Sequence, residues 1–527
     1  MSVILVIVAD QLRADHLGFE GRVPVRTPNI DRLAADGHVF SRAYAANPVC
    51  MPNRATIMTG RWPSAHGLRT NGIPLHPESE TFPRVLRSRG WRTAAVGKLH
   101  LQPMGYPYED YQLEQIRAAM PALWKRAVEG PFGETFLSWE DFERHAAGDV
   151  TLPPNYYGFD DVSIVCGHGD RVSGNYLRWA RERGFDPLAQ AGRANALQVF
   201  AGWAGQVYAS AAPTELHPTT YVTEEAIRRI DKYGEDGEDG ERQDKDLLLY
   251  VSYPDPHHPF APPAEYYSRH DPAAMPIPPS FGQDHARSPE HLRRIAARRG
   301  EPDIDPMMLW APTEEQFRHA LAVELGSIEF IDDSVGRILD AVNRNHLQNE
   351  TVIALTSDHG DVFGDHGLIL KHFTHYRGAV RVPLIISGAV QGSGTHPELV
   401  SSADIAPTLL DLVGADALQT AQGRSLVPLM AGEQVPWRSS LLIEEDQPYG
   451  IDGLPGPVRI RTLITDEFRI SRYAGTLQGE LYDLVADPDE TVNLFDEGGQ
   501  LRAAADNQLA DALMSVVDDS VVPFDAA

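Results

Sequence analysis

Four short apolar runs recur along the chain, and each stops abruptly at polar residues. They cover residues 3–8, 93–96, 247–251 and 351–355 and are rich in Val, Ile and Leu. Continuous apolar runs without alternation are typical of strands buried on both faces of a mostly parallel sheet. The pattern therefore predicts a large central sheet with both faces covered.

Helical patterns lie between these runs. Residues 29–37 and 82–90 each end in a glycine, which favours a helix C-terminus, and residues 315–343 carry apolar side chains at helical spacing. Strands that alternate with helices predict an α/β fold, in which helices sandwich a mostly parallel, mixed central sheet.

The character of the chain changes near residue 417. Strand patterns at 458–464 and 468–473 are separated by Thr465-Asp466-Glu467, which predicts an antiparallel hairpin. We therefore expect a large domain over residues 1–416 and a smaller α+β C-terminal domain over residues 417–527, carrying a short antiparallel sheet.

Two long segments, 103–245 and 262–306, interrupt the alternation of strands and helices. They are rich in Pro and in aromatic or charged residues, and we expect them to cover and shape a cleft. The acidic stretch 234–241 lacks the ligand order of a calcium-binding helix-loop-helix, so we interpret it as a solvated loop.

Charged or imidazole side chains follow each of the four predicted strands. Ligands bind outside the carboxyl ends of the strands in open α/β sheets, so these segments are expected to meet in one cleft. Any one of them is compatible with an ordinary polar loop, but four together favour a site. The residues are Asp10 and Gln11, Lys98 and His100, His257 and His258, and Asp358 and His359.

Composition narrows the class of protein. The 527 residues are 42% hydrophobic and 23% charged, and no apolar run approaches the roughly 20 residues that span a bilayer. The first ten residues lack a basic leader and are expected to form a buried strand, not a signal peptide. Two cysteines in so long a chain need no disulfide framework, which favours a reducing, cytoplasmic location.

The formal net charge of -28 bears on the choice of partner. An acidic surface repels phosphate backbones, so nucleic acid is not expected to bind, and the charge by itself indicates only solubility. An anionic substrate would need local positive charge, which Lys98, Lys371 and Arg54 could supply near the expected cleft.

The residue types at the strand ends suit a hard cation. Asp10, Asp358 and Gln11 offer oxygen atoms and His359 offers a nitrogen, a set that favours Ca²⁺ and tolerates Mn²⁺. Imidazoles have the pKa range needed for proton transfer near neutral pH, so His100 and His257 are candidate acids or bases.

Cys50 is the candidate nucleophile. Pro52 favours the first position of a helix, which would continue over residues 53–59, and unpaired N–H groups at a helix N-terminus stabilise a thiolate or an anion. The alternative is a buried cysteine that packs as a small apolar residue, which is how we interpret Cys166.

The segment Cys50-Met51-Pro52-Asn53-Arg54, followed by Thr59-Gly60, resembles the signature of type I sulfatases in the alkaline phosphatase superfamily. In that family a maturation enzyme oxidises the cysteine to formylglycine. The resemblance extends to the end of the chain through motifs at 97–100, 256–260, 357–360, Lys371, 381–386, 404–410, 480–483 and 487–490. It implies an alkaline-phosphatase-like fold for the predicted sheet and helices.

The resemblance implies a role for each matching residue. Asp10, Asp358, His359 and the formylglycine formed from Cys50 would bind one divalent metal ion, with Gln11 as a ligand or a substrate contact. Arg54 would fix the hydrated aldehyde, Lys98 and Lys371 would bind the nonbridging oxygens of the substrate, and Asn71 would contribute a donor. His258, His372 and His375 adjoin motif positions, where surface or supporting roles are as compatible as catalytic ones.

The implied reaction is a double displacement. One hydroxyl of the hydrated formylglycine attacks sulfur, assisted by Asp358, while His257 protonates the departing alcohol and a covalent sulfated intermediate forms. His100 then removes a proton from the second hydroxyl, and C–O cleavage releases inorganic sulfate.

The resemblance therefore implies hydrolysis of a small aryl or alkyl sulfate monoester, and a formylglycine-maturation enzyme acting on the nascent chain. Gln11 departs from the two consecutive acids of many sulfatases and is similar to choline sulfatases and phosphonate monoester hydrolases. A phosphonate monoester or phosphodiester hydrolase is thus the alternative, although Lys98 and His100 are sulfatase-like. A catalytically silent anion-binding protein is a third possibility, and we expect a homodimer because symmetric pairs are the commonest assembly.

Overall fold

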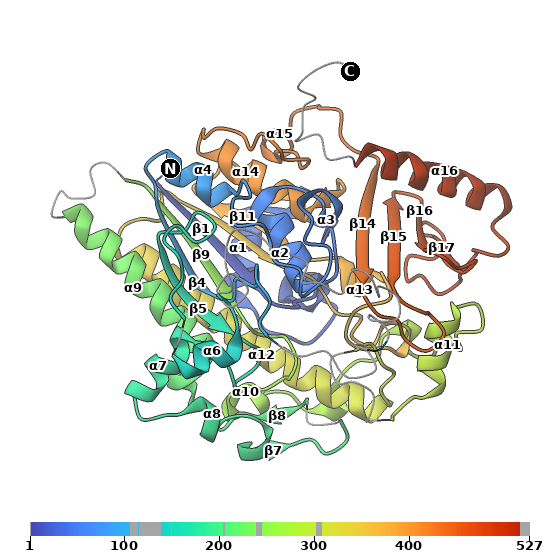
Figure 1. Ribbon diagram of the computed structural model, residues 1–527, viewed down its shortest axis with the longest axis horizontal. Helices are drawn as coiled ribbons and strands as arrows, with labels where there is room; N and C mark the ends of the chain where they lie inside the picture. The colour runs from blue at the N-terminus through green and yellow to red at the C-terminus, as the bar shows by residue number, and fades with distance from the viewer. Residues whose placement is uncertain are drawn as a thin grey trace.

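The computed structural model describes residues 2–105, 114, 139–148, 150–203, 206–238, 245–301 and 308–516. Its centre is a nine-stranded sheet (Figure 1). In spatial order the strands are β12 (Gly394–His396), β2 (His38–Phe40), β11 (Leu384–Gly388), β10 (Thr351–Ser357), β1 (Val3–Ala9), β9 (Leu247–Tyr253), β4 (Arg92–Gly97), β5 (Asp161–Cys166) and β6 (Ser173–Gly174).

The middle of this sheet is parallel and its margins are mixed. Strands β10, β1, β9, β4 and β5 run parallel to one another, whereas β11 pairs with β10 in the antiparallel sense. All four strands predicted from apolar runs are present in this parallel part. The prediction of a mostly parallel, mixed central sheet is therefore confirmed.

Successive side chains of β1 point into two different cores. Val3, Leu5 and Ile7 pack with α1 (Pro28–Asp36), α9 (Pro218–Glu238) and α12 (Glu314–Arg344) on one face of the sheet. Ile4, Val6 and Val8 pack with α2 (Cys50–Thr59), α4 (Phe82–Ser88) and α14 (Ile405–Leu412) on the other (Figure 1). Both faces are covered, which explains why the sequence of β1 is apolar at every position.

The helix predictions hold with local corrections. Helix α12 begins at a capping box formed by Thr313 and Gln316, close to the predicted start. Helix α9 runs to Glu238, so the expected loop at 234–241 is wrong for residues 234–238, and residues 239–241 lie outside the described part of the chain.

Gly37 follows α1 for a reason other than the expected C-cap. Its φ of -126° is extended and not left-handed. A Cβ at this position would lie 2.6 Å from the carbonyl oxygen of Ile386 in β11. Gly37 is therefore required by the close approach of α1 to the sheet.

A second sheet follows the helices near the C-terminus. Its antiparallel strands lie in the order β14 (Ser440–Gln447), β15 (Val458–Thr465), β16 (Phe468–Tyr473) and β17 (Gly479–Asp483), and α16 (Gly499–Ser515) packs on it. This unit lies beside the main sheet (Figure 1). The predicted hairpin and the small antiparallel sheet are confirmed.

The second sheet packs against parts of the larger unit that lie outside the main sheet. Trp62 donates its indole N–H to the carbonyl oxygen of Leu442 at 2.9 Å, and Tyr44 shares an apolar cluster with Leu441 and Ile464. Leu418 belongs to the same apolar cluster as the inner strands of the main sheet. A domain boundary at residue 417 stays a prediction.

The remaining elements are short. They are β3 (Ala43–Tyr44) paired with β13 (Val400–Ser401), β7 (Gln198–Val199) paired with β8 (Tyr208–Ala209), and the helices α3 (Pro63–His66), α6 (Phe142–Ala147), α7 (Asn175–Glu182), α8 (Pro187–Gln190), α10 (Ala264–Tyr267), α11 (Glu290–Ala297), α13 (Arg377–Val380) and α15 (Val427–Met430). Of the expected cleft-covering segments, residues 106–113, 115–138, 149, 204–205, 239–244 and 302–306 lie outside the description. Within the described residues, no helix combines the length and the apolar character needed to cross a membrane.

The strand register aligns the polar residues that follow each strand. Ala9 lies opposite Ser357 of β10 and Tyr253 of β9, so Asp10 and Asp358 emerge side by side. Gly97 of β4 lies opposite Ser252, which brings the following Lys98 to the same edge of the sheet. One edge of the sheet thus collects side chains from segments hundreds of residues apart.

We predict that Gly97→Ala lowers the free energy of unfolding by about 3 kcal/mol or more, because steric overlap adds to backbone strain. Gly97 has a φ of +100°, and a Cβ there would lie 1.8 Å from the carbonyl oxygen of Ser252. Gly67 is the matched control, since its φ is +83° and nothing lies within 4 Å of its Cβ position. Gly67→Ala should cost only about 1–2 kcal/mol. Equal losses in urea unfolding would contradict the role assigned to the contact.

Candidate functional site

The polar residues at the sheet edge form one buried cluster. The ammonium group of Lys98 donates to the carboxylate of Asp10, and both side chains are fully buried. Lys371, from the loop after β10, places its Nζ 2.9 Å from Nε2 of His257 and 2.8 Å from Nε2 of His359. Segments that follow β1, β4, β9 and β10 therefore meet at one point.

Arg54 holds the two carboxylates of the cluster in place. Its Nε donates to Oδ2 of Asp358 at 2.7 Å, and its Nη2 lies 3.6 Å from Oδ2 of Asp10. Its Nη1 donates to the carbonyl oxygen of Lys98 at 2.7 Å. Burial alone would raise the pKa of Asp10, but the positive charges of Lys98 and Arg54 lower it well below its ordinary value. Asp10 is therefore ionised in the folded protein.

Helix α2 presents Cys50 to this cluster. The helix begins at Cys50, which corrects the expected start at Pro52 by two residues and makes the cysteine its first residue. Asn53 anchors the helix, because its Oδ1 accepts the N–H of Ala46 at 2.9 Å and its amide donates to the carbonyl oxygen of Asp358. The buried N-terminus of α2 is thus tied directly to the loop after β10.

The thiol of Cys50 lies among charged and imidazole groups. Its Sγ is 3.3 Å from Nζ of Lys371, 3.1 Å from Nε2 of His359 and 3.8 Å from Oδ1 of Asp10. Burial raises the pKa of the thiol, although Lys371 and Lys98 oppose the shift. The unmodified side chain is therefore a neutral thiol and a poor nucleophile.

Several side chains of the cluster could hold one metal ion. One ligand atom from each of Asp10, Cys50, His257 and His359 lies within 4.8 Å of the others. Oδ1 of Asp358 is 3.8 Å from Nε2 of His359 and accepts the backbone N–H of Gln11 at 3.1 Å. Burial, together with the charge of Lys371, lowers the pKa of His359 to about 4, which leaves its imidazole neutral as a metal ligand must be.

Gln11 connects the cluster to the loop after β10. Its Oε1 accepts from Nζ of Lys371 at 3.1 Å, and its Nε2 donates to Oδ2 of Asp361 at 2.7 Å. The amide is therefore oriented, with its oxygen toward the cationic side of the site. This orientation is compatible with either role expected for Gln11.

The tautomer of His257 follows from its two contacts. Its Nδ1 faces the carbonyl oxygen of His258 and must carry the proton, so Nε2 accepts from Lys371. Burial, with the neighbouring His168 and Lys371, holds the pKa of His257 well below its ordinary value. His257 thus stands neutral beside the side chain of Lys371.

His100 and Asn71 lie beside the same centre. Burial, with the charges of Lys98 and Arg54, holds the pKa of His100 well below its usual range, and its Nδ1 has no hydrogen-bond partner among the described residues. Asn71 accepts the backbone N–H of Met51 at 3.2 Å through its Oδ1, which places it beside the first turn of α2.

His168 is a neighbour of the site that the sequence patterns did not reveal. Its Nε2 lies 2.6 Å from Nζ of Lys98, and its ring stacks on that of His257 with 3.9 Å between ring centres. His168 follows β5, the parallel neighbour of β4. Polar residues that follow the carboxyl ends of parallel strands therefore meet at this site from five strands, not four. The signal was weak because Ser163 interrupts the apolar run of β5.

The other histidines near the motifs have supporting contacts. His375 lies 3.2 Å from a carboxylate oxygen of Glu445 in β14, and Gln447 contacts His372 at 2.9 Å. Glu445 also accepts the backbone N–H of Phe373 at 3.1 Å. The C-terminal sheet therefore supports the loop that carries Lys371.

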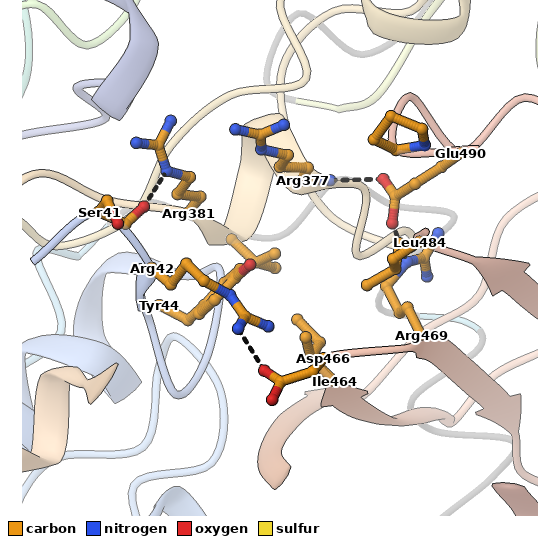
Figure 2. Close-up of a pocket in the computed structure, with 12 residues that line it drawn as sticks. Ser41, Arg42, Tyr44, Arg377, Arg381, Ile464, Asp466, Arg469, Leu484 and Glu490 are labelled. Atoms are coloured by element: carbon orange, nitrogen blue, oxygen red, sulfur yellow. Dashed lines mark hydrogen bonds and ion pairs between the residues drawn. The ribbon is translucent and has the colours of Figure 1, made fainter. Parts of the chain in front are cut away.

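A separate pocket lies between α13, the segment before β3 and the C-terminal sheet (Figure 2). Its lining contains none of the predicted site residues. Three of its arginines already face carboxylates, in the pairs Arg42–Asp466, Arg381–Glu20 and Arg469–Glu490. The buried cluster, and not this pocket, collects the predicted chemistry.

The fold and the cluster define a buried, charged site at the edge of an α/β sheet, whose side chains could hold a metal ion. A family model described as Sulfatase matches residues 2–415, and a model described as N-sulphoglucosamine sulphohydrolase, C-terminal, matches residues 364–518. The first match covers most of the chain. The chain therefore belongs to the sulfatase family, a class of sulfuric ester hydrolases.

Similar proteins span nearly the whole chain. This chain is 27% identical over 507 residues to an arylsulfatase of Clostridium perfringens, and the match covers 93% of this chain and 90% of that protein. It is 28% identical over 516 residues to the multifunctional alkaline phosphatase superfamily protein PehA of Trinickia caryophylli, with 93% and 90% covered. The phosphonate monoester hydrolase of Agrobacterium radiobacter has a similar structure, with a TM-score of 0.77, 24% identity, and 99% and 97% covered. The expected alkaline-phosphatase-like fold is confirmed.

We predict that Arg54→Ala lowers the free energy of unfolding by about 3–5 kcal/mol, because it leaves the buried carboxylate of Asp358 without its cationic partner and removes one of the two cations next to Asp10. Arg87→Ala serves as the control, since Arg87 and its partner Asp160 are both exposed. The control should cost less than about 1 kcal/mol. Urea unfolding of both variants at neutral pH measures the difference, and a small loss for Arg54→Ala would contradict the bridging role.

Proposed function

We propose that the protein hydrolyses a sulfate monoester, aryl or small alkyl, by double displacement through a formylglycine derived from Cys50, releasing inorganic sulfate. The observation that carries this proposal is the position of Cys50. It is the first residue of α2 and lies within 4 Å of Lys371, His359 and Asp10. Whether residue 50 is cysteine or formylglycine, its side chain faces both the lysine side chain and the residues that could bind a metal ion.

Lys98 and Lys371 would bind the nonbridging oxygens of the sulfuryl group. Both side chains are buried. Lys98 lies next to Asp10, and Lys371, from a different segment, lies next to His257. Buried ammonium groups in a low-dielectric site stabilise developing negative charge strongly. They supply the local positive charge that a protein of net charge -28 needs to hold an anion. Asn71, at the first turn of α2, would add a neutral donor.

Conversion of Cys50 must precede folding. Cys50 is 2% exposed, so a maturation enzyme could reach it only on the nascent or unfolded chain. The buried Nη2 of Arg54 lacks a hydrogen-bond partner among the described residues, which supports a polar group in place of the thiol. Arg54 would orient the hydrated aldehyde through this atom.

The donor set fits a hard divalent ion. Asp10, Asp358, His359 and the modified residue 50 would hold it, with Gln11 as a further ligand or a substrate contact, and we propose Ca²⁺, with Mn²⁺ as the alternative. Such an ion acidifies the nucleophilic hydroxyl and neutralises charge on the substrate. The geometry also brings His257 near, but the resemblance to sulfatases assigns it to proton transfer.

Two imidazoles would move the protons. His257 receives its Nε2 hydrogen bond from Lys371, and this pair holds a proton for the departing alcohol oxygen. His100 is neutral because its pKa is held low, so it can accept a proton from residue 50 in the second step. The two roles fall on the segments after β9 and β4, neighbouring strands that lie on one side of β1 and the Asp10 that follows it.

A phosphonate monoester or phosphodiester hydrolase is the second candidate. The presence of Gln11 and His359 favours this candidate. The structural similarity to the hydrolase of Agrobacterium radiobacter agrees with it, although at 24% identity this similarity concerns the fold alone. Lys98 and His100 oppose it, because this pair resembles sulfatases. The same site could support both reactions, with the phosphonate as a secondary substrate.

The cellular setting and the assembly are also proposed. Both Cys50 and Cys166 are free and buried, which supports a reducing, cytoplasmic environment. A homodimer is proposed from the general frequency of symmetric pairs.

We predict that peptide mass spectrometry detects formylglycine at position 50 when a maturation enzyme is coexpressed. Cys50→Ala should lower kcat by at least about 10³-fold, as loss of a nucleophile does, with little change in urea unfolding. Cys166→Ala is the control, because Cys166 is equally buried at the end of β5 and has no assigned role. Full activity of Cys50→Ala would refute the nucleophile assignment.

We predict that kcat/KM is higher for an aryl sulfate than for an aryl phenylphosphonate by about tenfold or more, equivalent to about 1.4 kcal/mol of transition-state binding. The reason is that Lys98 and His100 form the sulfatase-like pair. Both substrates are to be measured on one preparation with a known content of formylglycine. A larger value for the phosphonate would reverse the order of the two candidates.

A further inference from the structure

Glu140 organises the loop that carries His100. Its side chain is fully buried, and its carboxylate accepts three consecutive backbone N–H groups. Oε2 accepts from His100 at 2.6 Å, and Oε1 accepts from Leu101 at 2.9 Å and from Gln102 at 3.2 Å. A carboxylate with several backbone donors fixes the position of the chain that supplies them.

The loop needs such a partner because its backbone no longer pairs with a strand of the sheet. Lys98 still donates its backbone N–H to the carbonyl oxygen of Ser252, but the N–H groups from His100 onward no longer face β9. His100 adopts a φ of +52°, a left-handed conformation that non-glycine residues keep only when surrounding contacts enforce it. Glu140 supplies these contacts at the residue that requires them.

Glu140 is itself held by a second layer of contacts. The hydroxyl of Tyr156 donates to its Oε1 at 2.7 Å, and the neighbouring Tyr157 accepts from the amide of Gln102 at 2.6 Å. Four donors match the acceptor capacity of a carboxylate, and these hydrogen bonds oppose the burial that raises the pKa of Glu140 to about 7. The arrangement is therefore complete only with a carboxylate at position 140.

We propose that Glu140 is a positioning residue for His100, which it holds at the cluster through the backbone of residues 100–102. The inference rests on the proposed function, in which His100 removes a proton from residue 50. It assigns a role in the reaction to Glu140, which lies in the long segment expected only to cover the cleft.

Glu140→Gln tests the proposal with little change in size. The amide keeps one acceptor oxygen but turns an NH₂ group toward backbone donors, so at least one N–H in residues 100–102 loses its partner. We expect kcat for an aryl sulfate to fall by about 10- to 100-fold, as small displacements of a catalytic group produce, with KM changed less than about threefold. Hydrogen exchange of the amides of residues 100–102 should accelerate in parallel.

Asp332→Asn is the matched control. Asp332 is also a fully buried carboxylate that accepts consecutive backbone N–H groups, from Asn29 at 3.1 Å and Ile30 at 2.8 Å, but at the start of α1. This variant should lose stability while keeping kcat and the exchange rates of residues 100–102. If both variants lower kcat equally, or if Glu140→Gln leaves kcat within about twofold, the proposal is overturned.

Two further measurements keep the test decisive. If Glu140→Gln does not fold, Tyr156→Phe removes one donor to Glu140 and should lower kcat and amide protection in the same direction but less; no effect on either overturns the proposal. If the wild type with formylglycine at position 50 fails to hydrolyse aryl sulfates, the proposed function fails. Amide exchange then still reports whether Glu140 holds residues 100–102, and unchanged exchange in Glu140→Gln overturns that part separately.

Discussion

Charge compensation inside the protein is the constraint on which the rest of the site depends. Asp10 and Asp358 are fully buried carboxylates, and a buried charge is tolerated only with partners close by. Arg54 and Lys98 provide these partners from two separate segments, and Lys371 adds positive charge near Asp10. In the proposed function the same cations would also hold the sulfuryl group. One set of contacts would then serve both stability and anion recognition.

The sheet and the elements around it position different parts of this site. The parallel strands bring Asp10, Lys98, His257 and Asp358 to one edge through their register. Elements outside the sheet then fix the side chains that strands cannot place: Asn53 anchors α2, and Glu445 of the C-terminal sheet supports the loop of Lys371. The C-terminal sheet is thus part of the structural support of the site.

Much of this arrangement could be predicted from the sequence because its signals are local. Apolar runs identified the buried strands, the residues following them identified side chains that meet in the buried cluster, and the segment from Cys50 to Arg54 resembled a known signature. The boundaries were less certain: Pro52 suggested a helix start two residues late, and Gly37 was interpreted as a cap when its role is contact with β11. Local patterns do not record which distant backbone approaches a residue.

The sequence by itself determined the fold class, the catalytic candidates and the family, since each depends on residue type and order along the chain. Only the tertiary structure decided that His168 stacks on His257, that Lys371 donates to His257, and that Glu140 binds the backbone of the His100 loop. These contacts join residues between about 40 and more than 100 positions apart. Their existence depends on strand register and loop path, which are set by the packing of the whole molecule and leave no periodic trace in the sequence.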